Sequence, residues 1–453
     1  MKTNEGGNRW AVPFERLLAR QDLADLMTRR APQIRGMESL PAETAPQVLR
    51  MHLESIYIAN EPEVAWARTN LGLGHAHALK FYSTARRFAE DLHRKDLSLS
   101  PNPVTRMTTS EAGWGKSELA GALVRLFSDP ATFEVGHSLP HQRVVGIVRL
   151  SIDANTGTAS LLNTLAKQAG FPQDYSSGGA SAIAQIRRQM FIAGVMLIIA
   201  DEFQFLAQSA SASALIAKTL HFLRQIGLPL IFIANYSLGH KLLKRPQEDQ
   251  HRFLVNPEVL LPDARDSRGF RALISAYVEA MGSCLQLDPV ADAKMLHWYT
   301  GGNRRIFLEL VVLAYAEVRR TAAARGSVLV TMNDLGSAYA SIQFTPKRND
   351  VELCRKQLVE NKMARADLWC PFPLSPLQTD HRASLARELQ RSEIEHTALR
   401  SAATPEEVAG MRAMQAVFTT TEPGVQVPAK PRREKKKRET VEDLLATRPS
   451  YYG

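Results

Sequence analysis

The segment Ser110-Glu-Ala-Gly-Trp-Gly-Lys-Ser117 constrains this chain more than any other part of its sequence. It follows Val104–Thr109, a short run with strand character, and it precedes a stretch with apolar residues at helical spacing. The two glycines let backbone N–H groups close around an anion, and the start of a helix adds partial positive charge. A turn of this kind before a helix also arises by chance, so the prediction of a phosphate loop needs a second motif.

The residues of this loop each have a predicted role. Lys116 is expected to reach the β- and γ-phosphates of a nucleotide, and the Ser117 hydroxyl is expected to hold Mg²⁺. The backbone from Gly113 through Trp114 to Gly115 is expected to surround the phosphates. Ser110 stands where such a loop usually opens with glycine, and we include it in the nucleotide site.

The second motif is an apolar strand, Val195–Ala200, that ends in Asp201 and Glu202. The carboxyl ends of parallel strands face the ligand crevice of an α/β sheet. Asp201 is therefore predicted to hold Mg²⁺, and Glu202 is predicted to polarise the attacking water as a general base. Two acids after a strand can also be a solvated loop start, but the pairing with the loop at Lys116 favours a nucleotide site.

Three further positions complete the predicted site. Asn235 follows the expected strand Leu228–Ala234 and is predicted to orient the same water; a capping asparagine is the alternative. Arg252 is predicted to reach the γ-phosphate of a neighbouring subunit, unless it is a surface arginine. Arg304 or Arg305, after two glycines and an asparagine, is predicted to contact nucleotide; the alternative is that both face solvent.

Hydrophobic patterning divides the chain into five regions. Residues 1–80 predict several short helices, which we interpret as an N-terminal adaptor region. Residues 81–262 alternate strands with helices and predict an α/β core with a parallel sheet. Residues 263–345 read as successive helices, such as Phe270–Met281 and Arg305–Arg319, and predict a helical lid. Residues 346–420 predict a helical extension with a proline-rich linker, and residues 421–453 a disordered basic tail.

Composition excludes several classes of protein. Apolar residues at 45% and charged residues at 23% exclude a disordered chain. The 56 Lys and Arg residues exceed the 46 Asp and Glu residues, and the resulting charge of +10 favours a polyanionic partner without choosing nucleic acid or a membrane surface.

Three cysteines without C-x-x-C spacing exclude a disulfide framework and fit a reducing, cytoplasmic location. The longest apolar stretch, Met190–Ala200, is shorter than the ~20 residues that span a bilayer, so we expect no membrane association.

Taken in order, these motifs resemble the AAA+ ATPases and, more narrowly, the TnsC and TniB transposition regulators. The narrower resemblance rests on Leu150–Asp153 before a small polar loop, on Leu197–Gln204 and on Gly227–Ile233. The N-terminal extension and the basic tail resemble the longer TnsC type. Motif similarity covers roughly residues 100 to 310, and the layout alone is similar outside that range.

The resemblance implies an ATPase with ATP and Mg²⁺ as cofactors, which uses hydrolysis as a regulatory switch. It implies a homo-oligomer, ring or filament, on double-stranded target DNA that connects a target-selection protein of the TnsD or TniQ kind to the transposase. Positions similar to Lys167, Arg187 and Arg188 face DNA in family members, although basic residues on helices are more often solvated. A helicase loader and an oligomerising signalling NTPase without DNA remain alternatives; no long repeat region supports the latter.

The end of the chain carries a dense positive charge. Residues 430–438 hold seven Lys or Arg residues and one Glu, and a short amphipathic stretch and Tyr451-Tyr-Gly453 follow. The apolar residues exceed what an electrostatic tail needs, so we expect residues 430–453 to recruit a protein partner, the transposase. A solubilising tail with nonspecific attraction to DNA is the alternative.

Overall fold

The structure is a computed structural model that describes residues 8–391, apart from 95–96, 98, 130–131, 134–141, 154–156, 172–173, 204–211, 326–327, 381 and 388–389. The basic tail expected at residues 421–453 lies outside the described residues. Residues 392–420 of the expected helical extension lie outside them as well.

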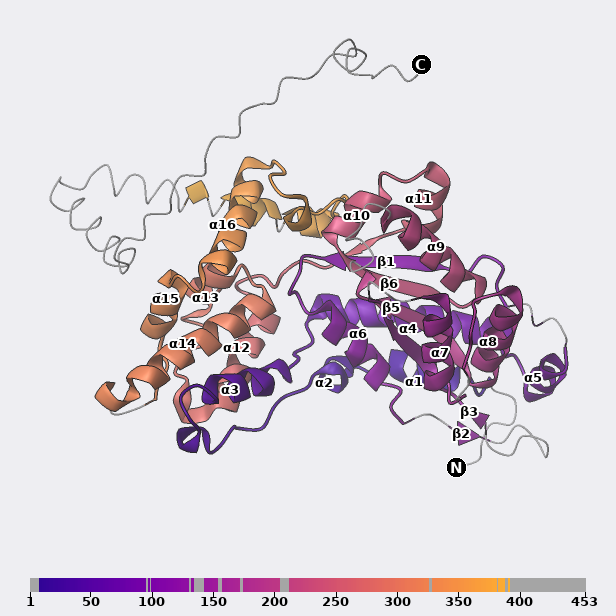
Figure 1. Cartoon of the computed structure of the whole chain (residues 1–453), viewed down its shortest axis with the longest axis horizontal. Helices are drawn as coiled ribbons and strands as arrows, with labels where there is room; N and C mark the ends of the chain where they lie inside the picture. The colour runs from indigo at the N-terminus through magenta and orange to yellow at the C-terminus, as the bar shows by residue number, and fades with distance from the viewer. Residues whose placement is uncertain are drawn as a thin grey trace, which may run out of the picture. The chain divides into compact units, whose positions relative to one another are not determined.

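Five parallel strands form the central sheet in the order β4, β5, β6, β1, β7. Three of them, β5, β6 and β1, are labelled in Figure 1 and lie side by side there. They are β1 Thr105–Ser110, β4 Gly146–Ser151, β5 Val195–Asp201, β6 Leu230–Asn235 and β7 Glu258–Val259. A short antiparallel pair, β2 Thr132–Phe133 and β3 Gln142–Arg143, lies apart from this sheet. The helices between the strands are α6 Lys116–Arg125, α7 Thr158–Gln168, α8 Ala180–Ile192, α9 Ala212–Gln225, α10 Tyr236–Leu242 and α11 Gln247–Phe253. The predicted α/β P-loop core with a parallel sheet is confirmed; β7 was not predicted.

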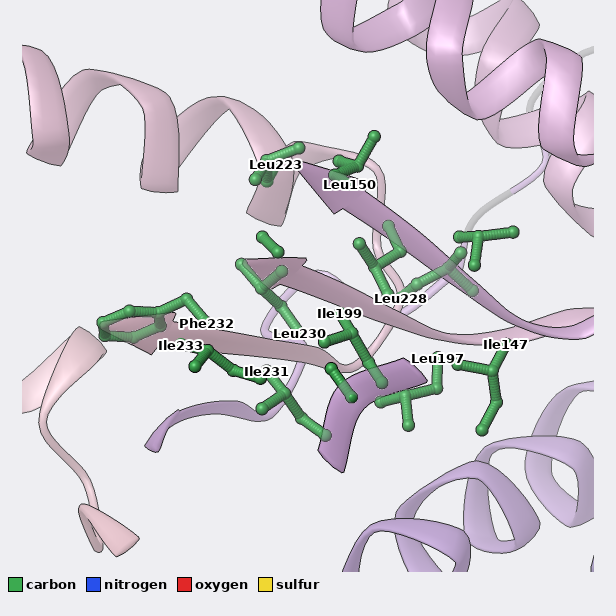
Figure 2. Packing of buried hydrophobic residues seen from close by; sticks show 14 of the residues in the cluster. Ile147, Leu150, Leu197, Ile199, Leu223, Leu228, Leu230, Ile231, Phe232 and Ile233 are labelled. Carbon is green, nitrogen blue, oxygen red and sulfur yellow. The ribbon is translucent and has the colours of Figure 1, made fainter. Parts of the chain in front are cut away.

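Strand β5 is buried along its whole length, and five of the six residues of β6 are buried. Parallel strands covered on both faces read as continuous apolar runs, and this is the pattern that the sequence shows here. Leu197, Ile199, Ile231 and Ile233 lie among the packed side chains in Figure 2. These two strands therefore provide a rigid base for the polar residues that follow them.

Strand β1 has an unusually polar sequence for a strand inside a sheet, and its neighbours explain this. It pairs with β6 on one side and with β7 on the other. The hydroxyl of Thr108 accepts a hydrogen bond of 2.8 Å from the indole Nε1 of Trp66, which lies on α4 (Glu61–Phe81). A buried hydroxyl costs little when it has a partner, so the N-terminal region offsets the cost of burying Thr108 in this strand.

The N-terminal region forms α1 Val12–Leu18, α2 Leu23–Met27, a 3-10 turn at Met37–Ser39, α3 Ala45–Glu54, α4 Glu61–Phe81 and α5 Ala85–Leu92. Most of these are short, as predicted, but α4 has 21 residues. Phe14 and Trp66 belong to the hydrophobic core around the sheet, whereas Leu49 and Leu53 belong to a second core. The division of the chain at residue 80 stays a prediction.

Most residues of the second hydrophobic core come from the helices that follow the sheet. These are α12 Arg268–Met281, α13 Ala293–Thr300, α14 Arg304–Arg325, α15 Met332–Ala340 and α16 Thr345–Glu360, with 3-10 turns at Gly282–Cys284 and Ala366–Leu368. The rings of Tyr277 and Phe307 stack with centroids 4.8 Å apart and join α12 to α14. Helices are thus present where the helical lid was predicted, and the bounds of the lid at residues 263–345 stay a prediction.

The proline-rich stretch after the lid packs against the core around the sheet and against α10. Phe372 is buried in the core around the sheet, and a ring nitrogen of His240 on α10 lies 2.9 Å from the Trp369 carbonyl oxygen. Among the described residues, no helix combines the length and apolar character needed to cross a membrane.

Candidate functional site

The loop between β1 and α6 has the backbone that its glycines predict. Gly113 and Gly115 have φ values of 80° and 106°, in the region that only glycine adopts freely. A Cβ atom at Gly113 would lie 2.8 Å from the side-chain oxygen of Asn303. Ser110 is the last residue of β1, and its φ is not in the left-handed region. The replacement of the usual first glycine by serine therefore causes no backbone strain here.

Lys116 is the first residue of α6, and 7% of its surface is exposed. Its Nζ donates to the Glu111 carbonyl oxygen at 2.8 Å and to the Ser110 hydroxyl at 3.0 Å. Burial lowers the pKa of Lys116 to about 8, while Glu111 opposes this shift. The ammonium group is thus partly desolvated and held by oxygen atoms that a phosphate can replace.

The sequence analysis predicted a role only for the backbone of Trp114, and the structure adds one for its side chain. Its indole ring is buried, and its Nε1 donates a hydrogen bond of 2.6 Å to the Leu261 carbonyl oxygen. The side chain therefore anchors the loop to the segment that leads into the lid.

Oxygen atoms from two elements meet beside the loop. The Ser117 hydroxyl donates to a carboxylate oxygen of Glu202 at 2.9 Å, and Asp201 accepts from the Glu202 backbone N–H at 2.8 Å. Glu202 has a φ of 65°, which is rare for a residue with a side chain and often marks a functional position. A serine hydroxyl and two carboxylates are hard oxygen donors that fit Mg²⁺, provided that nucleotide phosphates complete its ligands. No group of three or more His, Cys, Asp or Glu side chains suited to a metal occurs in the described part of the chain.

Arg149 also contacts the residues beside the loop, and the sequence analysis did not predict this. It lies on β4, and its guanidinium donates to a carboxylate oxygen of Asp201 at 2.6 Å. Its backbone N–H also donates to the side-chain oxygen of Gln168. A charged residue within an apolar strand, at Ile147–Leu150, was the available signal, because a charge in such a stretch usually has a partner.

Asn235 ends β6, next to the loop. Its Cα is the register partner of Ser110, so the carboxyl ends of β1 and β6 meet at this edge of the sheet. It occupies the cap position of α10, but its side chain makes no capping hydrogen bond. The alternative of a capping asparagine therefore loses its main support.

The start of α14 closes on the loop from the lid. The side-chain nitrogen of Asn303 donates to the Ala112 carbonyl oxygen at 2.8 Å, and the Arg305 backbone N–H donates to the Gly113 carbonyl oxygen at 3.1 Å. The Arg305 side chain is exposed, whereas Arg304 is largely buried against Glu63 and Asp263, two acids absent from the sequence prediction. An N-x-x-E capping signal at Asn60–Glu63 precedes α4 in the sequence and was the clue to the first acid.

Arg252 lies on α11, and its guanidinium pairs with Glu248 one turn earlier. This side chain is half exposed, and no contact brings it to the loop in the described chain. Its predicted role in a neighbouring subunit stays a prediction.

The three predicted DNA contacts have different surroundings. Lys167 is exposed in the last turn of α7. Arg187 donates to the Gln225 carbonyl oxygen at 2.6 Å, at the carboxyl end of α9, and Arg188 donates to the Leu92 carbonyl oxygen. The two arginines thus satisfy carbonyls at helix ends, a stabilising role that is compatible with further contacts.

Comparison with known proteins adds only distant similarities. No protein-family model matches the chain, and no curated protein matches it. The solved Aeropyrum pernix ORC2 protein (ADPNP-ADP complexes) is 15% identical, with 64% of this chain and 72% of that chain covered and a TM-score of 0.37. The Aeropyrum pernix ORC1 protein in complex with DNA is 18% identical, with 74% and 82% covered and a TM-score of 0.35. The Thermotoga maritima RuvB Holliday junction branch migration motor is 12% identical, with 57% and 69% covered and a TM-score of 0.31. Similarities this distant assign no ligand to the present chain.

Proposed function

We propose that this chain is an AAA+ ATPase that binds and hydrolyses ATP in the loop at residues 110–117. One observation carries this proposal: the phosphate loop, the acids after β5 and Asn235 converge at one edge of the sheet, and Asn303 closes the lid onto the loop. A parallel α/β sheet binds ligands at this edge.

Each side chain has a role in this proposal that follows from its chemistry. The backbone N–H groups of the loop and Lys116 bind the phosphates. Ser117 and Asp201 hold Mg²⁺, which neutralises charge on the transferred phosphate when it is bound. Glu202 leaves its hydrogen bond with Ser117 and accepts a proton from the attacking water, which Asn235 orients.

We further propose that ATP controls assembly on double-stranded DNA, and that the assembly regulates transposition by linking a target-selection protein to the transposase. The sequence resemblance and the net charge of +10 support this step. Contacts through Lys167, Arg187 and Arg188 would reach the phosphate backbone, so the binding would be sensitive to salt and insensitive to sequence.

The experiment that tests this function is electron microscopy of the Glu202→Gln variant with linear duplex DNA, with ATP or with no nucleotide. We expect ordered rings or filaments on DNA only with ATP, because the variant binds nucleotide without turnover. Assemblies that form equally without nucleotide would contradict a nucleotide switch, and ATP-dependent assemblies that ignore DNA would favour a signalling NTPase.

The transposase link has its own test, because the tail lies outside the described residues. Deletion of residues 440–453 is expected to leave ATP turnover and DNA binding near normal and to abolish transposase recruitment in a pull-down. Unchanged recruitment would refute the proposed role of the tail.

A further inference from the structure

Arg304 is held by two acids from different parts of the chain. Its two terminal nitrogens lie 3.0 Å from the two carboxylate oxygens of Glu63, which belongs to α4 in the N-terminal region. One of these nitrogens also lies 3.4 Å from a carboxylate oxygen of Asp263, in the segment between the sheet and the lid. Glu63 is fully buried and Asp263 is 7% exposed.

The two acids are themselves fixed by a common partner. Asn60 donates through its side-chain nitrogen to Asp263 at 2.6 Å and through its backbone N–H to Glu63 at 2.8 Å. The side-chain oxygen of Asn60 accepts from the Glu63 backbone N–H, which completes a capping box at the start of α4. The hydrogen bonds with Asn60 therefore hold both carboxylates in place independently of Arg304.

The same arginine lies beside the phosphate loop. Its guanidinium carbon is 5.3 Å from the centre of the Trp114 ring and 5.4 Å from that of Tyr57. A Cβ atom at Gly115 would lie 3.6 Å from Cδ of Arg304. The positive charge of Arg304 thus lies next to backbone that we propose binds phosphate.

The arrangement favours a fixed arginine over one that changes partners. Burial lowers the pKa of Arg304, but Glu63 and Asp263 outweigh this effect and raise it above its ordinary value. If the guanidinium left Glu63 for a phosphate, a buried carboxylate would lose its compensating charge, which is strongly unfavourable. Phosphate is therefore expected to approach the guanidinium while both acids remain bound.

We propose that Glu63 is a positioning residue of the nucleotide site: together with Asp263 it fixes Arg304 beside the phosphate loop, and α4 thereby links the N-terminal region to nucleotide binding. Arg304 is then the buried lid arginine of the site, whereas Arg305 is exposed and contacts the loop through its backbone N–H. This inference rests on the proposed binding of ATP and is independent of DNA or transposition.

The test is a double-mutant cycle on the affinity for a fluorescent ATP analogue in the full-length protein. Glu63→Gln removes the charge, and glutamine at this position keeps the capping box. We expect Glu63→Gln and Arg304→Gln each to weaken binding about tenfold, as for loss of a charge-assisted contact, and the double variant to be no weaker than Arg304→Gln. Asp263→Asn should weaken binding less than Glu63→Gln, since its ion pair is longer.

The control is Glu258→Gln, which removes a partly exposed glutamate whose ion-pair partner is Arg106, at 3.4 Å, and not Arg304. It should leave the affinity unchanged. Multiplicative effects in the double variant, or a lower melting temperature in Glu63→Gln with parental affinity, would overturn the positioning role. If Glu63→Gln does not fold, the same double-mutant cycle on affinity for the ATP analogue is measured with Asp263→Asn and Arg304→Gln. A parent protein that fails to bind the analogue would instead overturn the proposed ATPase function.

Discussion

The guanidinium of Arg149 lies 2.6 Å from the carboxylate of Asp201, the residue predicted to hold Mg²⁺. The Asp201 side chain is 2% exposed, whereas that of Arg149 is 32% exposed. The charge of the buried carboxylate is therefore compensated by an arginine whose side chain is partly exposed. The strand before Asp201 carries no other charge that could take this role.

Replacing Arg149 by glutamine should make the protein depend on MgATP for its stability. The variant leaves Asp201 without its ion-pair partner, which costs about 1–3 kcal/mol in the free protein. A bound cation would supply the missing charge, so the rise in melting temperature on adding MgATP should be larger than in the parent protein. Differential scanning fluorimetry with and without MgATP measures this difference.

The matched control is Arg106→Gln on β1, which also breaks a strand arginine pair, with Glu258 at 3.4 Å. It should lower the melting temperature without enlarging the response to MgATP. An equal response in both variants would show that Arg149 has no particular relation to the metal site.

His77 makes the fold sensitive to mild acid. Burial, helped by Lys80, lowers the pKa of His77 from 6.5 to about 3, and its Nε2 has no hydrogen-bond partner among the described residues. Below pH 6.5 the unfolded chain binds a proton here that the folded protein does not, so stability falls as the pH falls toward 3. At about pH 5 the loss from this residue is about 2 kcal/mol.

His77→Phe keeps an aromatic ring against Phe81, whose ring centre lies 4.6 Å away, and removes the titration. The free energy of unfolding in urea should then fall less between about pH 7 and about pH 5 than in the parent protein. The same fall in both proteins would exclude His77 as the source.

Lys116 should give ATP binding a dependence on alkaline pH. Because the pKa of the buried ammonium is about 8, the free protein loses this charge above that pH, whereas bound phosphate favours the charged form. Affinity should fall as the pH rises past 8, and binding should take up a proton there. Calorimetry in buffers of different ionisation enthalpy measures the uptake; constant affinity from about pH 7 to about pH 9 would contradict the perturbed lysine.

Arg252 should act on the nucleotide of a neighbouring subunit. Arg252→Ala and Lys116→Ala are each expected to abolish turnover, since one lacks the arginine and the other lacks the phosphate site. An equal mixture should recover activity at about a quarter of the subunit interfaces, where an intact loop meets an intact arginine. A mixture as inactive as its components would contradict an arginine supplied between subunits.

The sequence predicted the sheet and the main motifs because these have local signals. Strand β5 is a continuous apolar run with acids after it, and the loop before α6 contains two glycines that its backbone requires. Strand β7 has only two residues, Glu258–Val259, and is defined by pairing with β1, so no local pattern marks it.

The partners within the site could not be predicted in the same way. Arg149 meets Asp201 because β4 and β5 are neighbours, and Glu63 meets Arg304 across 241 positions of the chain. Such pairs depend on the tertiary fold, and a charged residue in an apolar stretch signals only that some partner exists. The choice between the two lid arginines was likewise ambiguous, because Arg304 and Arg305 are adjacent and only packing separates the buried from the exposed one.

The most direct measurement of the central claim is calorimetric titration of ATP into the parent protein, Lys116→Ala and Glu202→Gln. The site predicts that Lys116→Ala loses ATP binding, because the ammonium group contacts phosphate, and that Glu202→Gln binds ATP but does not hydrolyse it. Equal affinity for ATP in Lys116→Ala and in the parent protein would contradict the assignment of the nucleotide site to this loop.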